Sequence, residues 1–138
     1  MSRSRRSSLL IIFCLAIFGS TLLSGCGPSN SGPTRYPVSG MVKHKGQPVP
    51  KGFVTLEPDT ERGNNGPGGG AEIVDGRYDT NVAAGVVGGA YKVRITGTDG
   101  KPATESGETL PEGKPLFSPY ETVVDFPTEA TVKDFEIP

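Results

Sequence analysis

The chain of 138 residues has room for one domain, and its 34% hydrophobic content is low for the core of a large enzyme. Glycine (20) and proline (13) make up about a quarter of the residues, which is typical of disorder unless a strong strand pattern accompanies it. The net charge is −1, and all 15 acidic residues follow Cys26. A basic surface for nucleic acid is therefore not expected.

Residues 1–25 are predicted to be an export signal peptide. Three arginines between residues 3 and 6 form a positive n-region, residues 9–18 form an apolar h-region, and mostly small residues then lead to Cys26. The polar and small residues at 19–21 interrupt the apolar run, which leaves it short of the roughly 20 residues that a membrane span needs. A cleaved signal is therefore favoured over a transmembrane anchor.

The end of this segment, Leu23-Ser24-Gly25-Cys26, resembles the lipobox of bacterial lipoproteins. The resemblance implies that Leu23, Ser24 and Gly25 are recognised by the signal peptidase, which cleaves before Cys26. It also implies that the Cys26 sulfur receives a diacylglyceryl group and that the new amino group is acylated. Two or three acyl chains suffice for stable membrane attachment. Gly27, in place of an aspartate, favours sorting to the outer membrane over retention at the inner one.

The second cysteine, Cys14, lies in the h-region and would be removed with it. The mature chain would then hold one cysteine, already lipidated. A disulfide, a CxxC metal site and a cysteine nucleophile are therefore not expected.

Residues 26–35 are rich in Gly, Pro, Ser and Asn, and they are predicted to be a flexible tether. Order is expected to begin near Tyr36, so the folded domain would span residues 36–138.

Alternation with a period of two runs through this domain and predicts strands. Tyr91, Val93 and Ile95 point one way while Lys92 and Arg94 point the other. In the same way Val54 and Leu56 oppose Phe53 and Thr55, and Asp75-Gly76 is typical of a type I′ hairpin turn. The expected strands lie within residues 37–44, 52–58, 71–74, 77–80, 90–97, 120–126 and 131–137. Seven short strands predict an all-β fold, an antiparallel β-sandwich.

Two segments of the domain resemble the transthyretin-like, carboxypeptidase regulatory-like domain. In that family a first strand ending V-x-G-x-V precedes a G-x-P-V turn, and a glycine later precedes Y-x-V-x-V. The matching residues are Val38, Gly40, Val42, Gly46, Gln47, Pro48, Val49, Val54, Gly89, Tyr91, Val93 and Ile95. The motifs consist of strand and turn residues, so the resemblance implies a scaffold and no activity.

Residues that could carry out catalysis are scarce. His44 is the only histidine, and beside two lysines at the entrance to a turn it is expected to be solvated. A metal site or a catalytic triad would need more histidines. The transthyretin-like hydrolases of purine breakdown use several histidines and end Tyr-Arg-Gly-Ser, whereas this chain ends Asp-Phe-Glu-Ile-Pro. We expect no enzyme activity, no catalytic residue, no metal and no cofactor.

Two loops are candidates for a binding site. The glycine-rich segment 63–72 lacks the Gly-Lys-Ser/Thr ending of a phosphate loop, so a flexible interstrand loop is expected. The acidic residues at 57, 59 and 61, with Asn64, could offer oxygen ligands to Ca²⁺, but their spacing fits no EF-hand and favours a solvated loop. Segment 98–119 is long, and its composition favours disorder. Phe117 and Tyr120, at its end, are the aromatic residues most expected to be exposed for contact with a glycan.

Two functional hypotheses follow. The first is a lipid-anchored cell-envelope protein, bound to the membrane through Cys26, whose β-sandwich is a structural or protein-interaction module for an unidentified envelope partner. The alternative is a module that binds a glycan or a peptide with loops 58–70 and 98–119.

Overall fold

The computed structural model describes residues 32–138, of which Pro33–Pro138 form one folded unit. The predicted signal peptide (1–25), Cys26 and most of the predicted tether (26–35) lie outside the described residues. The strands are β1 (Val38–His44), β2 (Gln47–Pro48), β3 (Lys51–Pro58), β4 (Gly69–Val74), β5 (Arg77–Asp79), β6 (Gly89–Thr98), β7 (Ala103–Glu105), β8 (Glu108–Leu110), β9 (Tyr120–Phe126), β10 (Thr131–Val132) and β11 (Phe135–Ile137). A single 3-10 turn, η1 (Thr60–Arg62), lies between β3 and β4. None of the described segments is a helix of the length and hydropathy needed to cross a membrane.

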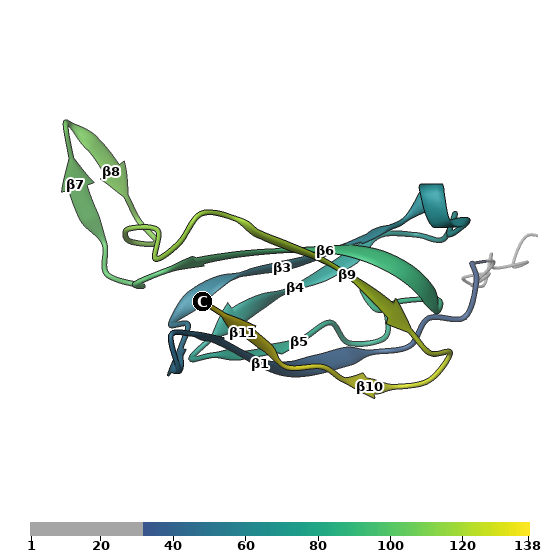
Figure 1. Ribbon diagram of the computed structural model, residues 1–138. Coiled ribbons are helices and arrows are strands. Elements are labelled where there is room, and N and C mark those ends of the chain that lie inside the picture. The colour runs from purple at the N-terminus through teal and green to yellow at the C-terminus, as the bar shows by residue number, and fades with distance from the viewer. Residues whose placement is uncertain (1–31) are drawn as a thin grey trace, which may run out of the picture. The chain divides into compact units, whose positions relative to one another are not determined.

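Nine of these strands form one curled, mainly antiparallel sheet (Figure 1). The hydrogen-bonded order is β10-β1-β5-β4-β3-β6-β9, and β2 and β11 also pair with β1. The pairs of β1 with β10 and with β11 are parallel. Phe126 from β9 and Phe135 from β11 belong to the same buried cluster, so the sheet curls until its two ends enclose one core.

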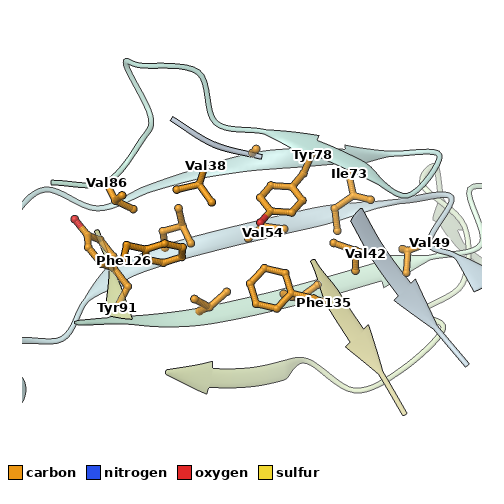
Figure 2. Packing of buried hydrophobic residues seen from close by; sticks show 14 of the residues in the cluster. Val38, Val42, Val49, Val54, Ile73, Tyr78, Val86, Tyr91, Phe126 and Phe135 are labelled. Carbon is orange, nitrogen blue, oxygen red and sulfur yellow. The ribbon is translucent and has the colours of Figure 1, made fainter. Parts of the chain in front are cut away.

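The core consists of the side chains that the alternation places on one face. In β6 and β3, Tyr91, Val54 and Ile95 are 0% exposed, while Phe53 on the opposite face is 42% exposed. Figure 2 shows Val54 and Tyr91 in one cluster with aromatic rings from β5, β9 and β11. Full burial of an aliphatic side chain contributes about 1.5–3 kcal/mol, so this cluster is the main source of stability. The predicted inward and outward faces of these strands are confirmed.

The predicted hairpin turn at Asp75-Gly76 is also confirmed. Asp75 has φ 50° and Gly76 has φ 79°, the left-handed values that a type I′ turn requires. A Cβ on Gly76 would lie 2.7 Å from the Cβ of Pro48. Glycine is needed here for both its backbone angle and its small size.

Strands β10 and β11 both run parallel to β1, and between them the Lys133 carbonyl comes close to Gly40, which has no side chain in its way. The Tyr78 hydroxyl donates to that carbonyl at 2.6 Å, and the Asp134 Oδ1 accepts from the Met41 amide at 2.8 Å. Burial, and then the nearby Asp134 carboxylate, raise the pKa of Tyr78 well above its ordinary value, which keeps the phenol a donor. These bonds hold the C-terminal strands against the sheet.

Two expectations are corrected. Residues 32–138 contain eleven strands instead of about seven, because they also form β2, β7 and β8 and because the last expected strand is divided into β10 and β11. Segment 98–119, expected to be disordered, holds the hairpin β7–β8, with Ser106 (φ 52°) and Gly107 (φ 87°) at its turn. This hairpin forms a sheet of its own that projects from one end of the main sheet (Figure 1).

Candidate functional site

The two loops expected to form a binding site lie at opposite ends of the sheet (Figure 1). Strands β3 and β6 are antiparallel: Lys51 pairs with Thr98 at one end, and Pro58 pairs with Tyr91 at the other. Loop 58–70 leaves the second end, and segment 98–119 leaves the first. At about 3.3 Å per residue, the eight-residue strand β3 separates them by roughly 25 Å. A single small-ligand site lined by both loops is therefore excluded.

The end at which the chain enters the domain is the one that carries loop 58–70. The Arg35 guanidinium donates to the Gly68 carbonyl at 2.6 Å and to the Gly85 carbonyl at 2.8 Å. Tyr36 forms an isolated antiparallel bridge with Val86. We call this end tether-proximal, and the end with the β7–β8 hairpin tether-distal.

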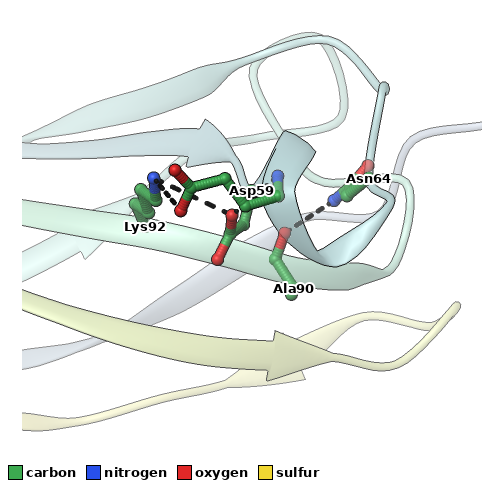
Figure 3. Close-up of polar contacts among 5 residues, drawn as sticks. Asp59, Asn64, Ala90 and Lys92 are labelled. Carbon is green, nitrogen blue, oxygen red and sulfur yellow. Dashed lines mark hydrogen bonds and ion pairs between the residues drawn. The ribbon is translucent and has the colours of Figure 1, made fainter.

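At the tether-proximal end, Asp59 is a structural residue and only 3% exposed (Figure 3). Its Oδ1 accepts from the Glu61 amide at 3.2 Å and caps η1. The Lys92 ammonium lies 3.8 Å from that oxygen and 3.2 Å from the Glu61 Oε2. The hydrogen bond to Glu61 and the two negative charges raise the pKa of Lys92. The Lys92 ammonium therefore occupies the position at which a metal cation would contact the Asp59 and Glu61 carboxylates.

Asn64 also has a structural role, because its side-chain amide is used in hydrogen bonds within the domain. Its Nδ2 donates to the Ala90 carbonyl at 2.8 Å and to the Gly88 carbonyl at 3.3 Å, and its Oδ1 accepts from the Gly66 amide. The Asn64 side chain joins the loop to β6, as Figure 3 shows for Ala90. Within residues 32–138, no three His, Cys, Asp or Glu side chains are grouped to hold a metal ion. The expected solvated loop is thus wrong for Asp59 and Asn64, which are buried.

At the tether-distal end, Asp99 organises the base of the β7–β8 hairpin. Its Oδ1 accepts from the amides of Lys101 and Lys114, both at 3.0 Å, across the two sides of the segment. The Thr98 hydroxyl donates to the Glu112 carbonyl at 2.6 Å. The hydrogen bond from the Lys101 amide is the main cause that lowers the pKa of Asp99. The hairpin itself contributes no residue to the buried core, so these bonds hold its base in place.

We expect acid to loosen this segment through Asp99. Because the folded state lowers the pKa of Asp99, its stabilising effect is complete above the ordinary value near 3.9 and is lost as the pH falls through the lower folded value. In an NMR titration, the amide shifts of Lys101 and Lys114 should therefore move with a shared midpoint below about 3.9. Asp99→Asn should abolish that transition. A midpoint at or above the ordinary value, or a transition that persists in the variant, would contradict the assignment.

Phe117 and Tyr120 do not form an exposed aromatic surface. Both are half-buried and pack against the core cluster. The Phe117 ring lies 5.1 Å from the ring of His44 and covers Gly97, whose Cβ, if present, would be 2.7 Å from the Phe117 Cζ. His44 is the last residue of β1, at the entrance to a turn as expected, but it is half-buried beside Phe117 instead of fully solvated.

Among the aromatic residues of segment 32–138, Phe53 is the exposed one, with 42% of its surface accessible to solvent. Its ring lies on the outer face of the sheet over Gly70, whose Cβ would be 2.7 Å from the Phe53 Cε1. The alternation that turned Val54 and Leu56 inward already placed Phe53 outward. That pattern was the signal that could have selected Phe53 instead of Phe117 as a candidate contact.

Comparison with known proteins gives no relative: no family model, no curated protein and no solved structure matches the chain. The likeness to the transthyretin-like domain stays a resemblance in strand and turn residues. The residues predicted for lipidation and signal cleavage, Leu23, Ser24, Gly25 and Cys26, lie outside the described residues.

Proposed function

We propose that this protein is a lipoprotein of the bacterial cell envelope, held to the membrane by lipid on Cys26, and that its β domain is a non-enzymatic structural or protein-interaction module. The observation that carries the proposal is the order of segments in the sequence: arginines, an apolar run, Leu23-Ser24-Gly25-Cys26, and a Gly/Pro/Ser-rich stretch. Gly27 after the lipidated cysteine favours the outer membrane. We propose the transthyretin-like sandwich as the fold type, which the curled sheet supports.

The position of Arg35 adds an orientation to this proposal. If residues 26–35 are the predicted tether, a flexible chain of that length spans a root-mean-square distance of roughly 17 Å, and the tether-proximal end would stay near the lipid surface. Loop 58–70 would then face the membrane, and the β7–β8 hairpin would point away from it. A partner in the envelope would meet the hairpin and the outer face of the sheet.

Glycan binding is the second candidate, and the exposed Phe53 ring is the observation that favours it. Aromatic rings on flat sheets stack on sugar faces, and the hydroxyl of Thr96 and the carboxylate of Glu72 lie on the strands that flank Phe53. The ligand would bind the middle of the sheet, away from both loops.

A glycan array separates the two candidates. The protein, solubilised in a non-ionic detergent, is expected to bind no sugar class saturably, and Phe53→Ala is expected to change nothing on the array. Saturable binding to one sugar class that Phe53→Ala abolishes would contradict the interaction-module proposal. Because Phe53 is partly exposed and outside the core, this variant should keep its fold, which an unfolding curve checks.

A further inference from the structure

The outer face of the sheet is hollowed over β1, β4, β5 and β10. The hollow has a volume of about 910 Å³, which is in the range of ligand-binding clefts, and it is open to solvent. Its apolar lining consists of Met41, Val74 and Val132. Val74 is 54% exposed and Val132 is 76% exposed, although both are strand residues with a high tendency to be buried.

The strand register places these side chains in two neighbouring rows. Val74 pairs with Arg77, and Arg77 pairs with Met41, which forms one row across β4, β5 and β1. In the next row, Asp79 pairs with Ser39, and Ser39 pairs with Val132. Side chains opposite each other in such pairs have Cβ atoms about 4.5–5.5 Å apart. Each row therefore places one valine next to charged or hydroxyl side chains. An extended peptide whose apolar and polar side chains alternate could contact both kinds of group.

The charges around the hollow are not balanced. Its carboxylates are those of Glu72, Asp75, Asp79 and Asp134. Arg77 is its one cationic lining residue, so four negative groups stand against one positive group. In the part of the chain that the structure describes, none of the four carboxylates has a lysine or arginine nitrogen within 4.0 Å.

The other half of the same face is different. Across β6 and β9, Arg94 lies 3.8 Å from Glu121, and Arg62 lies 3.2 Å from Asp125. Lys92 is paired with Glu61 as described above. The acidic groups Glu121, Asp125 and Glu61 are thus each paired with one of the domain's own bases, whereas within residues 32–138 the four carboxylates of the hollow are not.

We propose that this hollow binds an extended, basic segment of a partner protein, in which lysine or arginine alternates with small aliphatic residues. The aliphatic side chains would cover Val74 and Val132, and the cations would meet the unpaired carboxylates. An anionic lipid surface and nucleic acid are disfavoured by the same charge. The inference rests on the proposed role as a protein-interaction module and names the chemistry of its partner.

The test measures binding of a fluorescein-labelled hexapeptide that alternates lysine and valine to the full mature protein in non-ionic detergent, by fluorescence anisotropy. We expect saturable binding that weakens with added salt, and no binding of the matched peptide that alternates glutamate and valine. Glu72→Gln combined with Asp75→Asn should weaken binding about 3- to 10-fold. No described hydrogen bond uses either side chain, and asparagine tolerates the φ of 50° at position 75, so the fold should be kept.

The matched control is Glu57→Gln combined with Glu108→Gln, which changes the net charge equally on exposed residues that do not line the hollow. It should leave the affinity within about twofold. Equal weakening by both double variants would overturn the assignment to the hollow, as would the absence of saturable binding by the basic peptide. Neither result would bear on the lipid anchor or on the expected absence of glycan binding. The proposed function is tested by those separate experiments, so its failure can be distinguished from the failure of this inference.

Discussion

Replacing Cys26 with alanine is expected to abolish lipid attachment completely. The thiolate of Cys26 is the only group in the mature chain that can form the thioether, since the other cysteine lies in the predicted signal peptide. In cells fed an alkyne-tagged fatty acid, the wild-type protein should be labelled and recovered with the membranes after a high-salt wash. The variant should carry no label and should migrate as the longer, uncleaved precursor.

Cys14→Ala is the matched control for this experiment. It removes the other cysteine from the h-region, which tolerates alanine, and the protein should be labelled, cleaved and fractionated as the wild type is. If Cys26→Ala were labelled, or matured to the wild-type mass, the lipoprotein proposal would be wrong.

The largest expected loss of stability comes from Tyr91→Ala. Tyr91 is 0% exposed and packs edge-on against Phe126 of the neighbouring strand β9, with ring centroids 5.8 Å apart. Deleting such a buried aromatic ring lowers the free energy of unfolding by about 3–5 kcal/mol. That is a large share of the 5–15 kcal/mol typical of a domain, so the urea midpoint should fall by about 2 M.

Tyr91→Phe distinguishes the contribution of the ring to stability from that of its hydroxyl. The hydroxyl accepts from the Val87 amide at 3.2 Å and donates to the Pro67 carbonyl at 3.3 Å, which joins two loops at the tether-proximal end. Losing these bonds while keeping the ring should lower the free energy of unfolding by only about 1 kcal/mol. A loss of similar size in both variants would show that the ring is not the stabilising part.

The strands could be predicted from the sequence because their signal is local. Alternation in residues 91–95 reports which side chains are buried without reference to any partner strand. The closure of the sheet could not be predicted in this way. It depends on the bond between the Tyr78 hydroxyl and the Lys133 carbonyl, 55 residues apart, and on the close approach of that carbonyl to Gly40.

The misjudged loops have the same explanation. Asp59 and Asn64 belong to types that are usually exposed, and their burial depends on the carbonyl of Ala90, which is 26 residues from Asn64. The β7–β8 hairpin is short and polar, so it has no apolar alternation. Its one local signal is Ser106-Gly107, a turn dipeptide between runs that contain threonine.

The mass of the N-terminal peptide from the wild-type protein tests most directly whether this β domain is held at a membrane by lipid on its first mature residue. The protein is extracted from membranes with detergent and digested, and the peptide is sequenced by tandem mass spectrometry. We expect a peptide that begins at Cys26 and carries a diacylglyceryl group on the sulfur. A peptide that begins elsewhere, or a Cys26 with a free thiol, would contradict it.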